Sequence, residues 1–354
     1  MKTLCFFVVI LLLPWQASAA SFKLVHRYGR PIANREAAWN GHVDFASWLD
    51  DENVVFASRS GDVTCISLKD DKIQWTAPNV KEFRDWSLSR KTKRLACLAG
   101  DDIVSVIDCT NGKSLFNANP QHLARILGLR YAMPYRLAIT RDDGRLIVCN
   151  FSQSYGRHGY TLDPPYEKVS STFHVDALPK ELSVSPKGGR IAVVADKDVL
   201  CVRDIATDGD VFFLGERVTT APRSLTRTFD VPFFSHLRDG DSDTIVYTED
   251  NSWGIGRVFV HNIKAKNVKS FPARNGHIEL DVSFPARRIV LTGTSADLTL
   301  LDFDGKLLAH AEKTALQRNM CVEFSPNGQQ VLVGSWDNTL SIFRIDQDEK
   351  RGDK

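Results

Sequence analysis

Apolar and polar positions alternate in short runs along most of this chain, and the clearest case lies near its end. Val322 to Phe324 alternates as a strand, Ser325 to Gly328 has the composition of a turn, and Val331 to Gly334 is a second apolar run. Short alternating runs bounded by Gly, Pro, Asn or Asp are typical of β-hairpins. The pattern predicts antiparallel strands here, and no stretch of the chain shows helical periodicity sustained over more than a few turns.

This phrase recurs in weaker form about every 40–50 residues, which marks a repeat architecture. Seven copies are anchored at Phe45, Trp86, Leu137, Leu182, Phe234, Val282 and Val322. Each copy holds three or four short strands joined by turn residues, the pattern of a propeller blade. We therefore predict an all-β, seven-bladed β-propeller of four-stranded antiparallel blades, forming one domain over residues 20–346.

The last copy supplies only three strands before the chain becomes charged from Asp346 to Lys354. The segment from Phe22 to Tyr28 precedes the first copy and alternates as a strand. We expect it to pair as the outer strand of the last blade and to close the ring. Closure of this kind would remove an open sheet edge.

Two copies resemble WD repeats. Gly276-His277, Asp297 and Phe303 match the family's Gly-His pair, its turn aspartate and the position of its Trp. The last copy keeps Phe324-Ser325-Pro326, Asp337 and Phe343, although the Trp-Asp dipeptide is absent from every copy. The resemblance covers residues 40–346 and implies a propeller closed by its N-terminal strand. The first two copies also resemble quinoprotein-type blades, over residues 63–75 and 104–116.

The first residues have the composition of an export signal. Lys2 precedes the apolar run from Leu4 to Leu13, Pro14 ends that run, and Ala17-Ser18-Ala19 is a small-x-small cleavage site. The apolar run is shorter than the roughly 20 residues of a membrane span. We therefore predict a signal peptide over residues 1–19, no membrane insertion after its cleavage, and a periplasmic or secreted protein; an uncleaved anchor is the alternative. Residues 347–354 are expected to form a charged, flexible tail.

Composition excludes some partners. The formal charge is +2, and near +1 once Lys2 is removed, so no basic excess predicts nucleic-acid binding. Six cysteines remain after cleavage, and most lie within apolar strand patterns of different copies. We interpret them as mostly small buried apolar residues rather than a disulfide framework. We expect a monomer.

Candidate chemistry is sparse. There is no nucleophile elbow, phosphate loop, dinucleotide fingerprint or zinc motif, so we predict no catalytic residues, no metal and no cofactor. His277, Asp297 and Asp337 are expected to be structural residues of the blade motif. The resemblance to WD repeats implies a hydrogen bond between His277 and Asp297 inside their blade.

The loops that join the middle strands of the blades carry the residue types found at interface hot spots. These loops should gather on one face of the ring, where binding residues concentrate on rigid scaffolds. The candidate binding residues are Arg59, Tyr155, Arg157, His158, Trp253 and Trp336.

Two functional classes remain open at this level. The first is an exported, non-enzymatic propeller that acts as a scaffold and binds a protein partner through these loops. The second is a ligand-binding, hydrolytic or oxidoreductase propeller that uses the central channel, as lactonases and quinoproteins do. The second class requires acidic, basic or His side chains that converge on the axis, and sequence cannot assign them.

Overall fold

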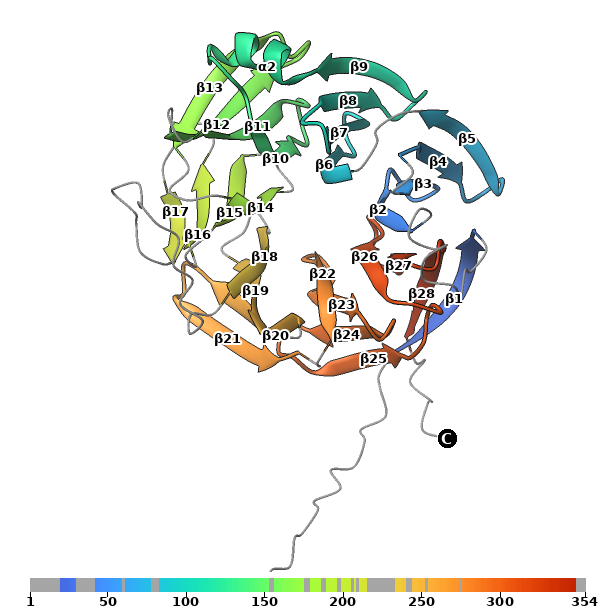
Figure 1. Cartoon of the computed structure of the whole chain (residues 1–354). Coiled ribbons are helices and arrows are strands. Elements are labelled where there is room, and N and C mark those ends of the chain that lie inside the picture. The colour runs from blue at the N-terminus through green and yellow to red at the C-terminus, as the bar shows by residue number, and fades with distance from the viewer. Residues whose placement is uncertain are drawn as a thin grey trace, which may run out of the picture.

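The chain forms seven sheets arranged in a ring around one axis (Figure 1). In this computed structural model the residues described are 20–29, 42–58, 61–77, 83–152, 156–174, 179–185, 189–195, 199–204, 207, 210–214, 233–239, 244–251, 254–273 and 276–347. Each sheet has four antiparallel strands. The predicted seven-bladed β-propeller is therefore confirmed.

Strands follow one another from the axis outward in each of the first six blades. Blade 1 contains β2 (Val43–Trp48), β3 (Asn53–Ser58), β4 (Val63–Ser67) and β5 (Lys72–Ala77). Blade 2 contains β6 (Phe83–Ser89), β7 (Arg94–Ala99), β8 (Val104–Asp108) and β9 (Lys113–Ala118). Blade 3 contains β10 (Pro134–Ile139), β11 (Leu146–Ser152), β12 (Gly156–Asp163) and β13 (Lys168–His174). Blade 4 contains β14 (Pro179–Val184), β15 (Arg190–Ala195), β16 (Val199–Asp204) and β17 (Asp210–Leu214). Blade 5 contains β18 (Phe233–Asp239), β19 (Thr244–Asn251), β20 (Gly254–Asn262) and β21 (Asn267–Pro272). Blade 6 contains β22 (His277–Ser283), β23 (Arg288–Gly293), β24 (Leu298–Asp302) and β25 (Leu307–Ala311).

Blade 7 is built from both ends of the chain. Its inner strands are β26 (Asn319–Phe324), β27 (Gln330–Ser335) and β28 (Leu340–Gln347), and its outer strand is β1 (Ala20–Tyr28). β1 pairs antiparallel with β28 from Ala20 opposite Gln347 to Tyr28 opposite Leu340. The predicted closure of the ring is confirmed.

The hydrophobic core is divided among the contacts between blades. The buried apolar residues of the described chain form seven clusters, and each cluster joins one pair of neighbouring blades. The cluster between blades 7 and 1 includes the fully buried Trp48 and Leu340. Because each blade packs only on its two neighbours, closing blade 7 against blade 1 completes the last of these clusters.

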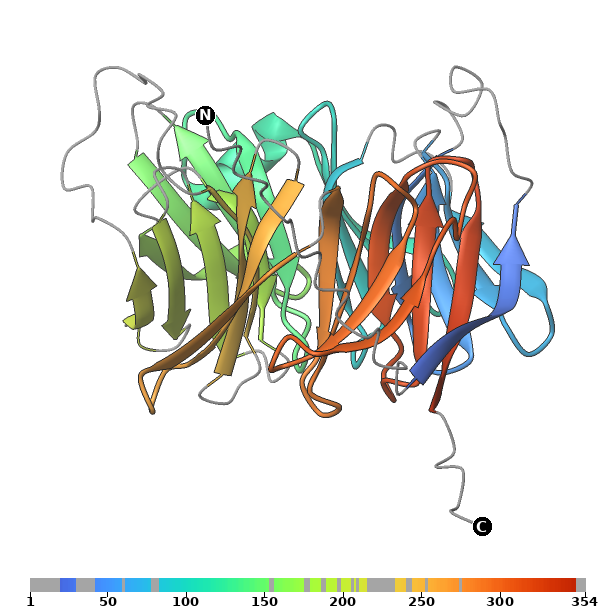
Figure 2. The ribbon, with the colours of Figure 1, turned by 90° about the horizontal axis from the view of Figure 1, so that it is seen from below.

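Alternating strand direction gives the ring two different faces. The turn between the first and second strands of a blade and the turn between its third and fourth strands lie on one face. The turn between the second and third strands and the connection to the next blade lie on the other, which we name the loop-bearing face (Figure 2).

One helix interrupts this regular scheme within the described residues. α2 (Pro120–Leu127) lies in the connection between blades 2 and 3, on the loop-bearing face (Figures 1 and 2). Asn119 caps its N-terminus by accepting a hydrogen bond from the His122 amide, and Gly128, with φ of 68°, ends it. The helix is two turns long, and its buried residues are Leu123, Ala124 and Leu127.

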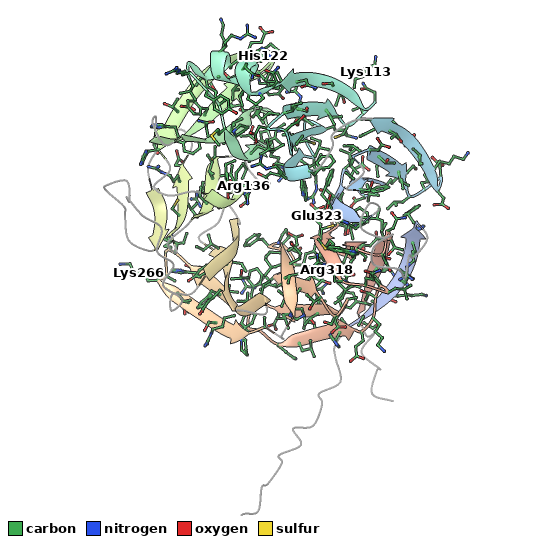
Figure 3. All side chains as sticks on the ribbon, viewed as in Figure 1. Lys113, His122, Arg136, Lys266, Arg318 and Glu323 are labelled. Carbon is green, nitrogen blue, oxygen red and sulfur yellow. The ribbon has the colours of Figure 1, made fainter. Side chains whose placement is uncertain are left out.

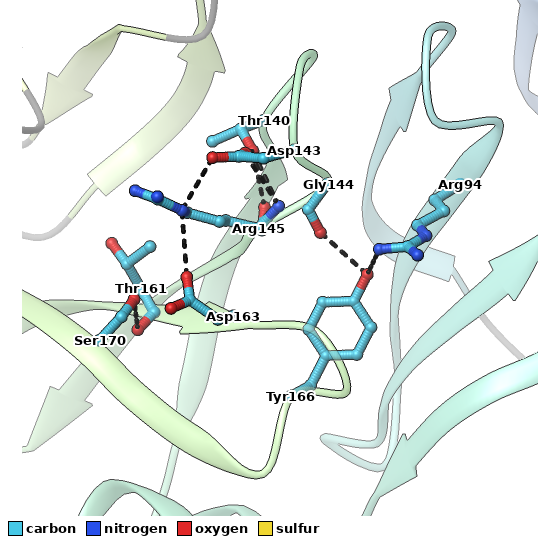
Figure 4. Close-up of polar contacts among 9 residues, drawn as sticks. All are labelled: Arg94, Thr140, Asp143, Gly144, Arg145, Thr161, Asp163, Tyr166 and Ser170. Carbon is cyan, nitrogen blue, oxygen red and sulfur yellow. Dashed lines mark hydrogen bonds and ion pairs between the residues drawn. The ribbon is translucent and has the colours of Figure 1, made fainter.

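Blades 2 and 3 are also joined at the opposite face. Tyr166 is buried, accepts a hydrogen bond from Arg94 Nη1 at 3.1 Å, and donates one to the Gly144 carbonyl at 2.9 Å (Figure 4). The Arg145 side chain lies between two carboxylates, 2.8 Å from Asp143 and 3.0 Å from Asp163. The contact between blades 2 and 3 is therefore stabilised at both faces of the ring, by the packing of α2 on one face and by the hydrogen bonds of Tyr166 on the other.

All six cysteines of the described residues are buried, and none of them forms a disulfide. Burial raises the pKa of Cys65 to about 11 and that of Cys149 to about 12. Burial also raises the pKa values of Cys97, Cys109 and Cys321. Their interpretation as small buried residues is confirmed. A neutral thiol is a poor nucleophile, so burial and the raised pKa values make these five thiols unreactive near neutral pH.

The raised thiol pKa values predict a loss of stability at alkaline pH. An unfolded cysteine ionises near pH 8.5, whereas these thiols stay neutral in the folded chain. The folded state therefore binds more protons, and each such thiol removes about 1.4 kcal/mol of stability per pH unit above about pH 8.5. Urea unfolding between neutral pH and about pH 10 measures this loss. Cys149→Ala should reduce the slope, and a midpoint that does not change with pH would contradict the prediction.

Candidate functional site

The loop-bearing face is the first candidate site, since the predicted binding residues belong to its loops. Arg59, Tyr155 and Trp253 lie outside the described residues. Arg157 lies on β12, opposite Phe151 of β11. His158 follows it, half-buried, with its ring 5.6 Å from that of His174.

Trp336 differs from an exposed hot-spot residue because only 3% of its surface is accessible. Its indole stacks on the His42 imidazole with 4.7 Å between centroids, and the Arg318 guanidinium lies 3.7 Å from the ring centroid. Its backbone amide donates a hydrogen bond to the Arg318 carbonyl at 2.9 Å. Trp336 therefore joins blade 7 to blade 1 and offers a partner little surface.

The structure does not bring the described candidates together. Figure 1 places β12, which carries His158, and the turn between β27 and β28, which carries Trp336, on different sides of the ring. One compact site containing both residues is therefore not formed. His158 and Arg157 belong to the blade 3 side of the loop-bearing face.

The blade-motif residues hold turns in place. Asp337 Oδ1 accepts hydrogen bonds from the amide and hydroxyl of Thr339, and its Oδ2 accepts one from the Leu316 amide at 2.8 Å. His277 is buried, and its Nε2 lies 3.2 Å from Thr299 Oγ1. The Asp297 carboxylate accepts a bond from the Lys313 amide. The bond between His277 and Asp297 stays a prediction.

Asp297 and Asp337 occupy different positions in the turns between the second and third strands of their blades. Gly334 pairs with Leu340 in blade 7, and Thr292 pairs with Leu298 in blade 6. Asp337 is the third residue after Gly334, and Ser295 is the third residue after Thr292. Ser295 of blade 6 therefore occupies the position that Asp337 has in blade 7. Asp297 therefore stands two residues further along its turn.

The axis of the ring is the second candidate site, because the inner strands carry carboxylates that sequence could not place. Asp85 accepts a hydrogen bond from the Leu137 amide at 2.7 Å. Asp281 accepts one from the Phe324 amide at 2.8 Å, and Glu323 accepts one from the Trp48 amide at 2.9 Å. In each case the acceptor lies on one inner strand and the donor on the inner strand of the next blade.

Glu323 has the most unusual surroundings of these carboxylates. It forms an ion pair with Arg90, which extends from blade 2 past blade 1 and donates a further hydrogen bond from Nε to the Trp48 carbonyl at 2.9 Å. Figure 3 shows Glu323 beside the axis. Burial raises the pKa of Glu323, the Arg90 charge opposes that rise, and the Asp281 carboxylate adds to it.

His42 and Asp44 form a second polar pair at the contact between blades 7 and 1. His42 Nε2 lies 2.6 Å from Asp44 Oδ1, and His42 is almost fully buried. Since the same imidazole stacks on Trp336, the pair orients this ring contact. Within the described residues, no group of three or more His, Cys, Asp and Glu side chains is placed to hold a metal ion.

The comparisons with known proteins give no family. No family model and no curated protein matches this chain. The fold is therefore established by geometry alone, and a function must be argued from the residues of the two candidate sites. In the described part of the chain, no helix is both long and apolar enough to cross a membrane.

Sequence reasoning missed α2 and the segment that follows it, which present Arg125, Arg130, Tyr131 and Met133 on the loop-bearing face. A local signal was available. Asn119-Pro120 is a typical helix start, Gly128 a typical stop, and Leu123, Ala124 and Leu127 have helical spacing between them. The helix is shorter than the windows in which such periodicity is usually sought.

Proposed function

We propose that this protein is an exported, non-enzymatic propeller of the WD-repeat type that binds a protein partner through its loop-bearing face. The observation that carries the proposal is the use of the inner-strand carboxylates. Asp85, Asp281 and Glu323 each hold a backbone amide of the following blade. Groups with this task maintain the ring, which leaves the varied connections of the loop-bearing face as the surface for recognition.

Two features support export. The first strand begins at Ala20, directly after the cleavage site predicted at Ala17-Ser18-Ala19. Cleavage there would leave a chain that starts with its closing strand. The six thiols are also compatible with an oxidising compartment, because burial shields them from oxidants.

Kinship with WD repeats is supported by two contacts. Asp337 and Thr339 are hydrogen-bonded to each other across the turn between β27 and β28, and His277 is buried against Thr299 at the start of blade 6. Both contacts use residues of the motif positions quoted above. They make the chain a divergent member in this proposal.

The test is affinity capture with the mature chain, residues 20–354, as bait in extracts of the native envelope or secreted fraction. We expect one protein to be enriched over a bait with the loop substitutions Tyr155→Ala, Arg157→Ala and Trp253→Ala. The variant bait should keep the thermal stability of the parent. Absence of any enriched protein, or equal enrichment on both baits, would count against the proposal. N-terminal sequencing of the exported chain checks the cleavage site.

A small-ligand site at the axis is the second candidate, favoured by Glu323 with Asp281 and Arg90 around it. A carboxylate with a raised pKa beside a second carboxylate is a feature of many active sites. Glu323→Gln separates the two candidates. It should leave partner capture unchanged if the loop-bearing face binds the partner.

A further inference from the structure

The segment around α2 differs in charge from the rest of this near-neutral chain. Residues 109–141 include Lys113, Arg125, Arg130, Arg136 and Arg141 but no Asp or Glu. Lys113 begins β9 directly after the turn from β8, and Arg141 lies in the turn between β10 and β11; both turns are on the opposite face. Arg125 and Arg130 therefore place positive charge on the loop-bearing face, where blade 2 meets blade 3, and Arg136 lies on the inner strand β10.

Four exposed side chains form what we name the α2 strip: Arg125, Arg130, Tyr131 and Met133. Tyr131 is 48% exposed and Met133 is 44% exposed, whereas Ala132 between them is fully buried. Tyr131 and Met133 therefore both face solvent, on either side of an Ala132 that packs inward. Solvent exposure of an aromatic ring next to a methionine is characteristic of interaction surfaces.

The backbone under the strip is held firmly. Leu123, Ala124 and Leu127 of α2 and the following Ala132 belong to the core cluster between blades 2 and 3. The Met133 amide donates a hydrogen bond to Asn150 Oδ1 of β11 at 2.6 Å. A partner would therefore meet a preformed surface, which lowers the entropy lost on binding.

The two guanidinium groups of the strip make no ion pair or side-chain hydrogen bond within the described residues. On the same face blade 2 carries Asp101 and Asp102, of which Asp102 pairs with Arg84. Arg125 lies in the last turn of α2 and gains from the helix dipole. Arg130 lies beyond the end of the helix, so the helix dipole does not stabilise its charge.

We infer that the α2 strip docks an acidic, extended segment of the protein partner, with carboxylates on Arg125 and Arg130 and an apolar side chain against Tyr131 and Met133. The inference rests on the function proposed above and names the surface and the partner chemistry. Arginine forks match carboxylates in two parallel hydrogen bonds. Methionine adapts its shape to an apolar side chain. Figure 3 marks the two sides of this region, with His122 on α2 at the outer edge and Arg136 near the axis.

Charge count favours a protein over other anions. Binding to an anionic bilayer through charge alone takes clusters of about four to eight basic residues, and nucleic-acid binding needs a comparable series of phosphate contacts. Two free guanidinium groups beside two apolar side chains fit a short peptide segment better than they fit a bilayer surface or a nucleic acid.

The direct test uses a fluorescent peptide in which Glu and Asp residues flank a central Phe, and the same peptide with Gln and Asn in their place. We expect the mature chain to bind the acidic peptide at low salt and to bind the amide peptide at least tenfold more weakly. The double variant Arg125→Glu, Arg130→Glu should lose at least tenfold in affinity. Lys113→Glu with Lys264→Glu is the control, since it changes the net charge equally at exposed positions of the opposite face.

Several outcomes would overturn the inference: no binding of the acidic peptide, equal loss with the control variant, or tighter binding of phosphatidylserine vesicles that Arg125→Glu, Arg130→Glu abolishes. The capture experiment separates this inference from the proposed function. A partner still captured by the Arg125→Glu, Arg130→Glu bait refutes the α2 strip and leaves the scaffold function standing. Failure of every bait to capture a protein refutes the scaffold function itself. Tyr131→Ala and Met133→Ala should each weaken peptide binding without changing thermal stability.

Discussion

Removal of β1 should unfold most of this protein or convert it into aggregates. A chain that begins at Gly29 lacks the eight paired positions that join β1 to β28. It also loses Ala20, Phe22, Val25 and Tyr28 from the clusters on both sides of blade 7. We expect a loss of about 5 kcal/mol or more, since each backbone hydrogen bond contributes about 1 kcal/mol net and each buried apolar side chain about 2 kcal/mol. That is much of the stability of an ordinary domain.

The exposed β28 edge would add aggregation to the loss of stability, because an unpaired strand templates pairing with another chain. Urea unfolding and size-exclusion chromatography of residues 29–354 and 20–354 measure both effects. Removal of residues 348–354 is the control for chain length. A shortened chain that stays monomeric and equally stable would contradict closure by β1.

A milder change keeps this prediction testable if the deletion abolishes folding. Phe22 is half-buried, and its ring lies 6.4 Å from that of Phe343 in an edge-to-face contact. Phe22→Ala should cost about 1.5 kcal/mol, less than truncation of a fully buried Phe. Leu24→Ala on the same strand is the matched control, because 43% of Leu24 is exposed.

The second large effect concerns the bond between Arg90 and Glu323. Glu323→Ala removes the acceptor for the Trp48 amide and the ion-pair partner of Arg90 in one step. Removing one side of a buried ion pair costs about 3–5 kcal/mol, but Arg90 is 37% exposed, so we expect about 2 kcal/mol. Urea unfolding of the two single variants and of the double variant gives the coupling energy. A coupling near zero would show that the two residues act independently.

Arg90→Ala should make stability depend on pH in a defined direction. Without Arg90, burial and the Asp281 carboxylate raise the pKa of Glu323 further. The folded chain then binds a proton more tightly than the unfolded chain, so stability falls as pH rises from about 4, the pKa of an unfolded glutamate, towards neutral. The cost of Arg90→Ala should therefore be smaller in acid than at neutral pH. Adding Glu323→Gln should remove this difference, and a constant cost across the range would contradict the assignment.

Much of the candidate surface could be located from sequence, but its individual contacts could not. Loops between middle strands were expected on one face, and strand direction places them there. Trp336 has the residue type of an interface hot spot, yet the ring closure brings His42 of blade 1 against it and buries it. No periodic signal marks Arg125 and Tyr131, because α2 is only two turns long and Tyr131 lies in the irregular segment after it.

What the sequence determined by itself is the scaffold. Blade number, strand positions and the closing role of β1 follow from alternation and turn residues, which act over a few neighbouring positions. The segment from Phe22 to Tyr28, predicted as the closing strand, lies within β1 (Ala20–Tyr28). Only the tertiary structure decided the contacts that close the ring and shape its surface. Trp48 and Glu323 are 275 residues apart in the chain, and they meet because blade 7 packs on blade 1. No local pattern spans that separation, so the bond appears only once the blades are assembled. The exposure of the α2 strip is likewise decided by the packing of Leu123, Ala124 and Leu127 between blades 2 and 3.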